Sequence, residues 1–107
     1  MDSAPLVDPV LTRFRAAVED IYGARVERVV LYGSRARGEA QPESDYDVAV
    51  FLRDLSDRSA EMDRLAELSA VILYDSGELI HAMPYGAGSY ADHTPLMAEI
   101  RADGIDL

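Results

Sequence analysis

The stretch that decides the fold reads LYGSRARG at residues 31–38 and, after a turn-rich segment, SDYDVAV at residues 44–50. Apolar and β-branched side chains precede the first motif and continue from the second, which is typical of two buried β-strands. We expect these strands at Val26–Tyr32 and Asp45–Leu52. The first strand ends abruptly at Gly33, where the chain enters a short helix.

The first motif has the residue types of a phosphate-binding turn. Gly33 lets the backbone approach a ligand closely, because it has no side chain. The hydroxyl of Ser34 and the amides at the start of the short helix can bind phosphate oxygens. Arg35 and Arg37 can add cationic contacts to the same ligand. A Gly-Ser dipeptide alone is typical of an ordinary turn, so the interpretation depends on the second motif.

The second motif supplies two carboxylates. Asp45 and Asp47 are two residues apart on an expected strand, so their side chains project from the same face. Paired carboxylate oxygens suit Mg²⁺, which prefers carboxylate and phosphate oxygens. Two aspartates alone are typical of a solvated strand, but their position after a glycine-serine turn favours a site for Mg²⁺ and phosphate.

The rest of the chain alternates between helical and strand-like patterns. We expect one helix at about 9–22 and a second from after Ser56-Asp57 to about Leu73. A turn at Asp75–Gly77 and a strand at Glu78–Met83, which Pro84 ends, should follow. The last helix is expected between Thr94-Pro95 and Gly104. This order predicts an α/β (α+β) fold, in which helices pack against a small mixed β-sheet of three or more strands.

Three other features have plain structural interpretations. A stripe of side chains on the second long helix is expected to be core: Met62, Leu65, Ala66, Leu68, Ser69 and Ile72. Tyr85 and Tyr90 either pack locally or contact a base or a partner. His93 is expected to be exposed to solvent, since it lies in a polar loop.

Composition excludes several classes of protein. The length of 107 residues predicts a single domain over 1–107. The 20 acidic and 10 basic residues, all arginines, give a net charge of −10, which opposes direct binding to DNA or RNA. The absence of cysteine excludes disulfides and thiol catalysis. No apolar run reaches the ~20 residues that a bilayer requires, so we expect a soluble, cytoplasmic protein.

The two motifs and their spacing resemble the nucleotidyltransferase superfamily related to DNA polymerase β. The residues that carry this resemblance are Gly33–Gly38 and Ser44–Asp47, with hydrophobic strands on either side. The short chain is similar to the minimal nucleotidyltransferases, called MNT proteins, which are encoded beside helical HEPN proteins as antitoxin and toxin. The ending at Pro95–Ile105 also resembles that group. The resemblance implies the nucleotidyltransferase fold over about residues 9–105.

The resemblance also implies roles for individual residues. The β and γ phosphates of a nucleoside triphosphate would be held by Gly33 and Ser34, with help from Arg35 and Arg37, and Mg²⁺ by Asp45 and Asp47. The reaction moves a nucleoside monophosphate onto a hydroxyl and releases pyrophosphate. In the related antitoxins the donor is ATP and the acceptor is a tyrosine of the HEPN toxin. The resemblance therefore implies AMPylation of a partner protein, a reaction of EC class 2.7.7.

One departure from the family pattern leaves a role open. The family commonly places a third carboxylate on the next core strand, where it helps to bind metal or acts as a general base. Here that strand reads Glu78-Leu79-Ile80-His81-Ala82-Met83, with no aspartate at its centre. Glu78 could supply the third group, His81 could serve as a base near neutral pH, or neither residue could take the role.

Two hypotheses about function follow. The first is a metal-dependent enzyme that modifies a partner protein. The second is a catalytically weak or inactive nucleotide-binding module that neutralises a helical HEPN toxin by forming a complex with it. Transfer to a small molecule such as an aminoglycoside is a weaker alternative, since so small a domain would have to dimerise to build that pocket. A homo- or hetero-oligomer is compatible with each hypothesis.

Overall fold

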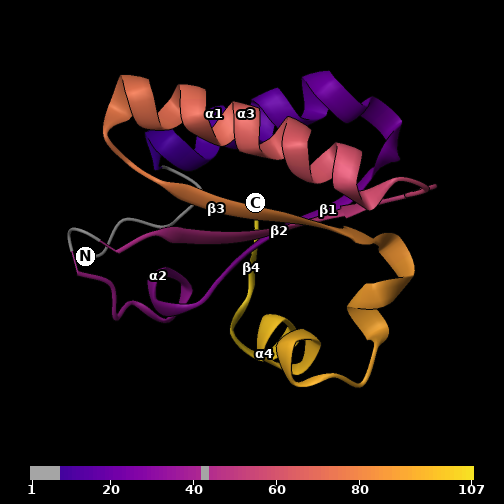
Figure 1. Ribbon diagram of the computed structural model, residues 1–107. Coiled ribbons are helices and arrows are strands. Elements are labelled where there is room, and N and C mark those ends of the chain that lie inside the picture. Colours follow the sequence, from indigo (N-terminus) through magenta and orange to yellow (C-terminus); the bar gives the residue numbers. More distant parts are fainter. Residues whose placement is uncertain (1–7, 42–43) are drawn as a thin grey trace.

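The computed structural model describes residues 8–41 and 44–107. Its α-helices and strands run in the order α1 (Pro9–Tyr22), β1 (Val26–Tyr32), α2 (Ser34–Arg37), β2 (Tyr46–Leu52), α3 (Arg58–Ser76), β3 (Ile80–Gly86), α4 (Pro95–Asp103) and β4 (Ile105–Asp106) (Figure 1). Two 3₁₀ turns, η2 (Gly23–Arg25) and η3 (Ala87–Ala91), join neighbouring elements. No helix in these two ranges is long and apolar enough to cross a membrane.

The four described strands form one mixed sheet in the order β3-β2-β1-β4. Strands β1 and β2 are antiparallel, and Tyr32 lies opposite Asp47. Strands β2 and β3 are parallel, and Asp47 lies opposite His81. The short β4 pairs antiparallel with β1. The predicted α+β fold with a mixed sheet is confirmed.

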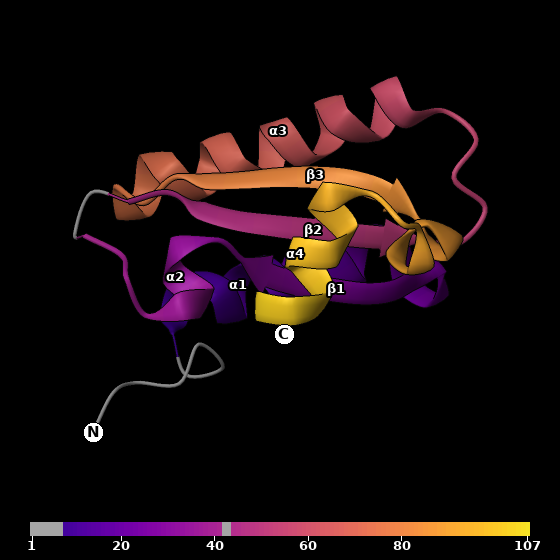
Figure 2. The same cartoon turned by 90° about the horizontal axis from the view of Figure 1, so that it is seen from below.

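The two faces of the sheet are covered unequally. Helices α1 and α3 lie together over one face, whereas α4 and η3 lie below the other (Figures 1 and 2). Alternation along β2 sends Val48 and Val50 into the larger core under α1 and α3, and Ala49 and Phe51 into the smaller core near α4. By the same alternation, Asp47 belongs to the face that carries α4.

Local signals define most helix ends. The Asp8 carboxylate accepts a hydrogen bond from the Val10 amide at 2.8 Å and caps α1, as the Asp8-Pro9 pair predicts. The Thr94 hydroxyl accepts from the Met97 amide at 3.2 Å and caps α4. Gly23 follows the last residue of α1, and Gly104 follows the last residue of α4. These bounds agree with the predicted helices.

The structure corrects the predicted end of the second long helix. Asp75 and Ser76 are the last residues of α3 and form no separate turn. Gly77, at φ +77°, ends the helix, and its amide donates to the Leu73 carbonyl at 2.8 Å. The predicted core stripe on this helix is correct only in part. Leu65, Ser69 and Ile72 are buried, but Met62 is 36% exposed.

The structure also corrects both later strands. Strand β2 begins at Tyr46, one residue after the predicted start. Strand β3 begins at Ile80 and continues through Pro84 to Gly86, so Pro84 does not end it. Pro84 can lie inside β3 because β3 is an edge strand of the sheet. A proline is tolerated there if its missing N–H would face away from the neighbouring strand.

Candidate functional site

The site is built around contact between the end of β1 and the start of β2. Gly33 follows β1 with φ +74°, a backbone conformation that glycine adopts easily. A Cβ atom at this position would lie only 2.5 Å from Asp47 Oδ2. The glycine therefore allows the Asp47 carboxylate to pack against the turn that enters α2. The structure thus places Gly33 beside Asp47.

The parallel pairing of β2 with β3 brings a third polar side chain to Asp47. His81 Nδ1 lies 3.7 Å from Asp47 Oδ1, and the side chains of His81 and Asp47 are 62% and 35% exposed. Partial burial raises the pKa of the Asp47 carboxyl above its ordinary value, and the nearby Asp45 charge also raises it. The nearby side chains of His81 and Arg37 lower the pKa of Asp47. Asp47 is thus a half-buried carboxylate in a position where a bound cation would stabilise its charge.

The two candidates for the third group lie in different surroundings. His81 is the residue of β3 in register with Asp47. Glu78 precedes β3, and its carboxylate lies 4.0 Å from Arg35 Nη2. The geometry therefore brings His81 to the Asp47 carboxylate, while Glu78 interacts with a residue of α2.

Arg35 holds the segment that leads into β2. Its Nε and Nη2 donate to the Ser44 carbonyl at 3.0 and 2.6 Å. Its guanidinium also stacks 3.9 Å from the centre of the Tyr46 ring. Because Asp45 lies between these two partners in sequence, Arg35 restrains the backbone that carries it. The contacts that the structure shows for Arg35 therefore position the carboxylate segment.

Arg37 faces the last helix. It pairs with Glu39 at 2.9 Å, and its Nη1 lies 3.9 Å from Glu99 and 3.6 Å from Asp103 on α4. The hydrogen bond to Glu39 is the main reason why the pKa of Arg37 is raised. Ser34 is half-buried at the first position of α2. Arg37 thus stands between the Asp47 charge and the acidic side chains of α4.

Sequence reasoning missed two contacts that support the site. The Tyr46 hydroxyl donates to Asp8 Oδ2 at 2.7 Å, so the residue that caps α1 also fixes the strand between Asp45 and Asp47. Tyr32 lies buried opposite Asp47, and burial raises its pKa to about 12, with Tyr85 and Asp47 contributing. Both tyrosines lie within the two motifs, but their partners are distant in sequence. The strand register identifies the partner of Tyr32, and the packing of α1 on the sheet identifies that of Tyr46.

The other aromatic and histidine residues have structural surroundings. Tyr85 and Tyr90 pack on Phe51, with ring centres 5.7 and 5.4 Å from it. Arg28 lies 4.0 Å from the centre of the Tyr90 ring. These contacts agree with the local-packing interpretation. His93 is exposed, as predicted.

The donor set of the site fits Mg²⁺ bound together with a nucleotide. Mg²⁺ is commonly held by one or two carboxylates while substrate phosphates and water complete its coordination. Asp45 and Asp47 supply two carboxylates, and Asp45 is exposed. Within the part of the chain that the structure describes, no three His, Asp or Glu side chains form a group that could hold a metal ion. The remaining ligands would therefore come from the triphosphate.

Comparison with known proteins identifies the fold and the family. The fold is similar to a crystal structure of a toxin–antitoxin with AMP-PNP, at TM-score 0.62 and 18% identity over 88% of this chain and 69% of that one. A mutant of the toxin–antitoxin MntA-HpeT gives TM-score 0.61 and 16% identity over the same shares of 88% and 69%. No curated protein matches the sequence significantly. A family model described as a nucleotidyltransferase domain matches residues 11–94, a range that contains both motifs. The chain therefore belongs to the nucleotidyltransferase domain family.

Proposed function

We propose that residues 1–107 form one nucleotidyltransferase domain that moves AMP from ATP onto a hydroxyl of a partner protein. In this proposal the chain is the antitoxin of a toxin–antitoxin pair, and the partner is a helical HEPN-type toxin. Two similar solved structures are toxin–antitoxin structures, and one of them was crystallised with AMP-PNP. The other carries two aspartate-to-glutamate substitutions two positions apart, the same spacing as Asp45 and Asp47.

The observation that carries the proposal is the contact between Gly33 and Asp47. It joins the turn of the glycine-serine motif to a half-buried carboxylate, so that phosphate and metal-binding groups would meet in one place. Asp45 and Asp47 would hold Mg²⁺, and Gly33 and Ser34 would contact the phosphates. When bound, Mg²⁺ neutralises the triphosphate charge and lowers the pKa of the attacking hydroxyl.

The residues of this chain would then act on the acceptor. The acceptor oxygen forms a bond to the α-phosphorus, and the bond from that phosphorus to the pyrophosphate oxygen breaks. The hydroxyl proton must leave as the new bond forms. This geometry favours the exposed His81 imidazole, 3.7 Å from Asp47, as the base that takes this proton. Arg35 positions the Asp45 segment throughout.

A second candidate function is supported by a different observation. The residue of β3 in register with Asp47 is His81, and Glu78 lies by Arg35, so among the described residues no third carboxylate is seen to join Asp45 and Asp47. The chain would then be a nucleotide-binding module that neutralises its toxin by forming a complex. The two functions differ in whether covalent transfer occurs.

Intact-mass spectrometry distinguishes these functions. The protein, together with any helical protein that co-purifies with it, is incubated with ATP and Mg²⁺. We expect the partner to gain one or more AMP units, and we expect Asp45→Asn and Asp47→Asn to abolish this gain. Asp20→Asn, an exposed substitution on α1, is the matched control. A stable complex that gains no mass would favour the binding module.

A further inference from the structure

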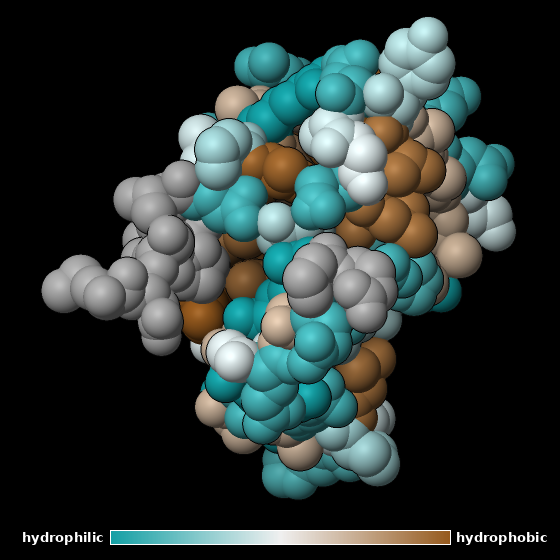
Figure 3. Space-filling view, turned by 90° about the vertical axis from the view of Figure 1, so that its left-hand side faces the viewer, coloured by the Kyte–Doolittle hydropathy of each residue, from teal (hydrophilic) through white to brown (hydrophobic). Residues whose placement is uncertain are grey.

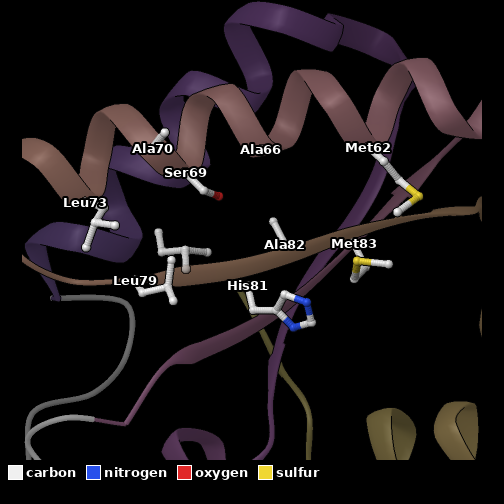
Figure 4. Close-up of a pocket in the computed structure, with 10 residues that line it drawn as sticks. Met62, Ala66, Ser69, Ala70, Leu73, Leu79, His81, Ala82 and Met83 are labelled. Carbon is white, nitrogen blue, oxygen red and sulfur yellow. The ribbon is translucent and has the colours of Figure 1, made fainter.

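An apolar groove runs between α3 and the outer edge of β3. We call it the α3–β3 groove. It has a volume of ≈370 Å³, and its lining includes Met62, Ala66, Ser69 and Leu73 from α3 and residues 79–83 from the strand side. Figure 4 shows Ser69 and Ala82 pointing into this space, whereas His81 points away from α3. Hydrophobic surface also gathers on the flank of the molecule below α3, at the right of Figure 3.

One polar group in the groove lacks a partner. Ser69 is only 6% exposed, and its Oγ forms no hydrogen bond with the described residues. Figure 4 shows this oxygen pointing from α3 toward β3. An unsatisfied buried hydroxyl is costly, so such groups normally have a partner. Leu79 at 41% exposed and Met62 at 36% exposed frame the same space. These features suit an incoming apolar side chain that is accompanied by a hydrogen-bonding group.

The backbone of β3 offers pairing groups along the groove. The Leu79 carbonyl accepts from the Tyr46 amide at 2.9 Å, so the backbone groups of residue 79 point toward β2. Because these groups alternate along a strand, those of Ile80, Ala82 and Pro84 point outward. Pro84 has no N–H, and its carbonyl accepts from Arg58 Nε at 2.9 Å. The part of the edge that an added strand could use is therefore limited to Ile80–Ala82.

The charge around the groove indicates the kind of occupant. Asp63 and Glu67 are exposed on α3, one turn apart, in the same helical row as the groove residue Ala70. The chain as a whole carries a net charge of −10. A second copy would bring the same charge and be repelled, whereas a basic segment would be attracted.

We propose that an extended, basic segment of the partner protein binds as an added strand on the β3 edge and places an apolar side chain in the α3–β3 groove. This inference rests on the proposed function and names how the acceptor is recognised. Side chains of an added strand alternate between the two faces of the sheet. The residue next to the one in the groove therefore lies on the face of His81 and Asp47. That neighbouring residue carries the acceptor hydroxyl.

The proposed docking would bring the acceptor hydroxyl to the groups already assigned to the transfer. The acceptor oxygen of the docked segment bonds to the α-phosphorus of ATP, pyrophosphate leaves with the electrons of the broken bond, and the hydroxyl proton passes to His81. The substrate class is thus an extended peptide in which an apolar residue adjoins a hydroxyl-bearing residue, between basic residues.

The test uses a short synthetic peptide in which leucine and tyrosine alternate between arginine ends. Its binding to the full chain is measured by fluorescence anisotropy, and AMP transfer to it is measured separately by mass. Ala66→Gln fills the groove from an exposed helix position, and Ala82→Pro removes one outward N–H. Ala16→Gln, exposed on α1, is the matched control.

We expect both groove variants to weaken peptide binding at least about tenfold, which corresponds to ~1.4 kcal/mol, while the control binds like the wild type. Equal binding by all variants would overturn the proposal, as would absence of binding at millimolar peptide. A concentration-dependent dimer that only the groove variants lose would overturn it in favour of self-association. Binding that depends on the groove but transfers no AMP would leave the docking intact and contradict the enzymatic function.

Discussion

Gly33 and Asp47 are in such close contact that a methyl group on Gly33 would lie 2.5 Å from the carboxylate oxygen Oδ2. The contact joins two residues that are separated in sequence by residues 34–46. It requires both the absence of a side chain and a backbone with φ +74°. Residue 33 thus controls the position of the carboxylate as well as the turn into α2.

Replacing Gly33 tests this relationship. We expect Gly33→Ala to lower the free energy of unfolding by about 1–3 kcal/mol and to abolish AMP transfer, because the new methyl group displaces Asp47. Gly77→Ala is the control, since Gly77 has φ +77° but open space around its Cβ position. It should share the backbone strain and retain the activity. Urea unfolding and intact mass measure the two effects, and equal activity of both variants would contradict the interpretation.

Ligand binding should stabilise the protein through its carboxylates. A ligand at a hundred times its Kd adds about 2.7 kcal/mol to the free energy of unfolding. For a chain of this size, that corresponds to a rise in Tm of roughly 10 °C or more. We expect ATP with Mg²⁺ to raise Tm more than ATP with EDTA, and the double variant Asp45→Asn, Asp47→Asn to lose the difference. If that double variant keeps the Mg²⁺-dependent shift, the metal is bound elsewhere.

Arginine at position 35 should be required for its shape as well as its charge. Arg35→Lys keeps the charge but loses the paired hydrogen bonds to the Ser44 carbonyl and the planar stacking on Tyr46. We expect a loss of about 1–2 kcal/mol in unfolding free energy and at least a tenfold loss of transfer. Arg13→Lys, in a surface ion pair with Asp75, should change neither quantity appreciably. A fully active Arg35→Lys variant would show that the segment needs no such restraint.

High pH should weaken the fold through its buried tyrosines. Burial, together with the hydrogen bond to Asp8, raises the pKa of Tyr46 from 10.0 to about 12. Between these two values the unfolded chain loses the proton that the folded chain retains, so stability falls as pH rises from 10 to 12. Tyr46→Phe should be about 1 kcal/mol less stable at neutral pH and lose less stability over this window.

Tyr74→Phe is the control for that experiment, since Tyr74 is 91% exposed. It should unfold like the wild type at each pH. Chemical denaturation at several pH values provides the comparison. A Tyr46→Phe variant with an unchanged pH profile would show that the Tyr46 hydroxyl does not stabilise the folded state.

Local sequence signals predict the parts of this fold that local interactions determine. The bounds of β1 follow from its apolar run, and α1 begins where Asp8 and Pro9 indicate. The contact of Asp47 with His81 could not be predicted, because it depends on the register of β2 against β3. The hydrogen bond between Tyr46 and Asp8 could not be predicted either, because it joins residues 38 positions apart along the chain.

The errors at β3 and α3 also have physical causes. A proline normally ends a central strand but is tolerated in an edge strand. The sequence around Pro84 does not reveal that β3 lies at the edge of the sheet. Asp75 and Ser76 are residue types that favour turns, yet both belong to α3. The Ser76 hydroxyl donates to the Ile72 carbonyl at 2.6 Å, one turn earlier in the same helix. The two-residue β4 is too short for any periodic pattern to indicate it.

The inequality of the two sheet edges has a consequence for assembly. At one end of the sheet lies β3, and at the other lies β4, which is only two residues long. Edge-to-edge growth into a filament requires each molecule to offer a long edge on both sides. Among the described residues, β3 offers the long edge on one side, and β4 pairs with Val30 and Leu31 of β1 on the other. Pro84 and Arg58 shorten the β3 edge further. Pairing through β3 therefore occupies the long edge of the sheet, which disfavours further growth into a fibre.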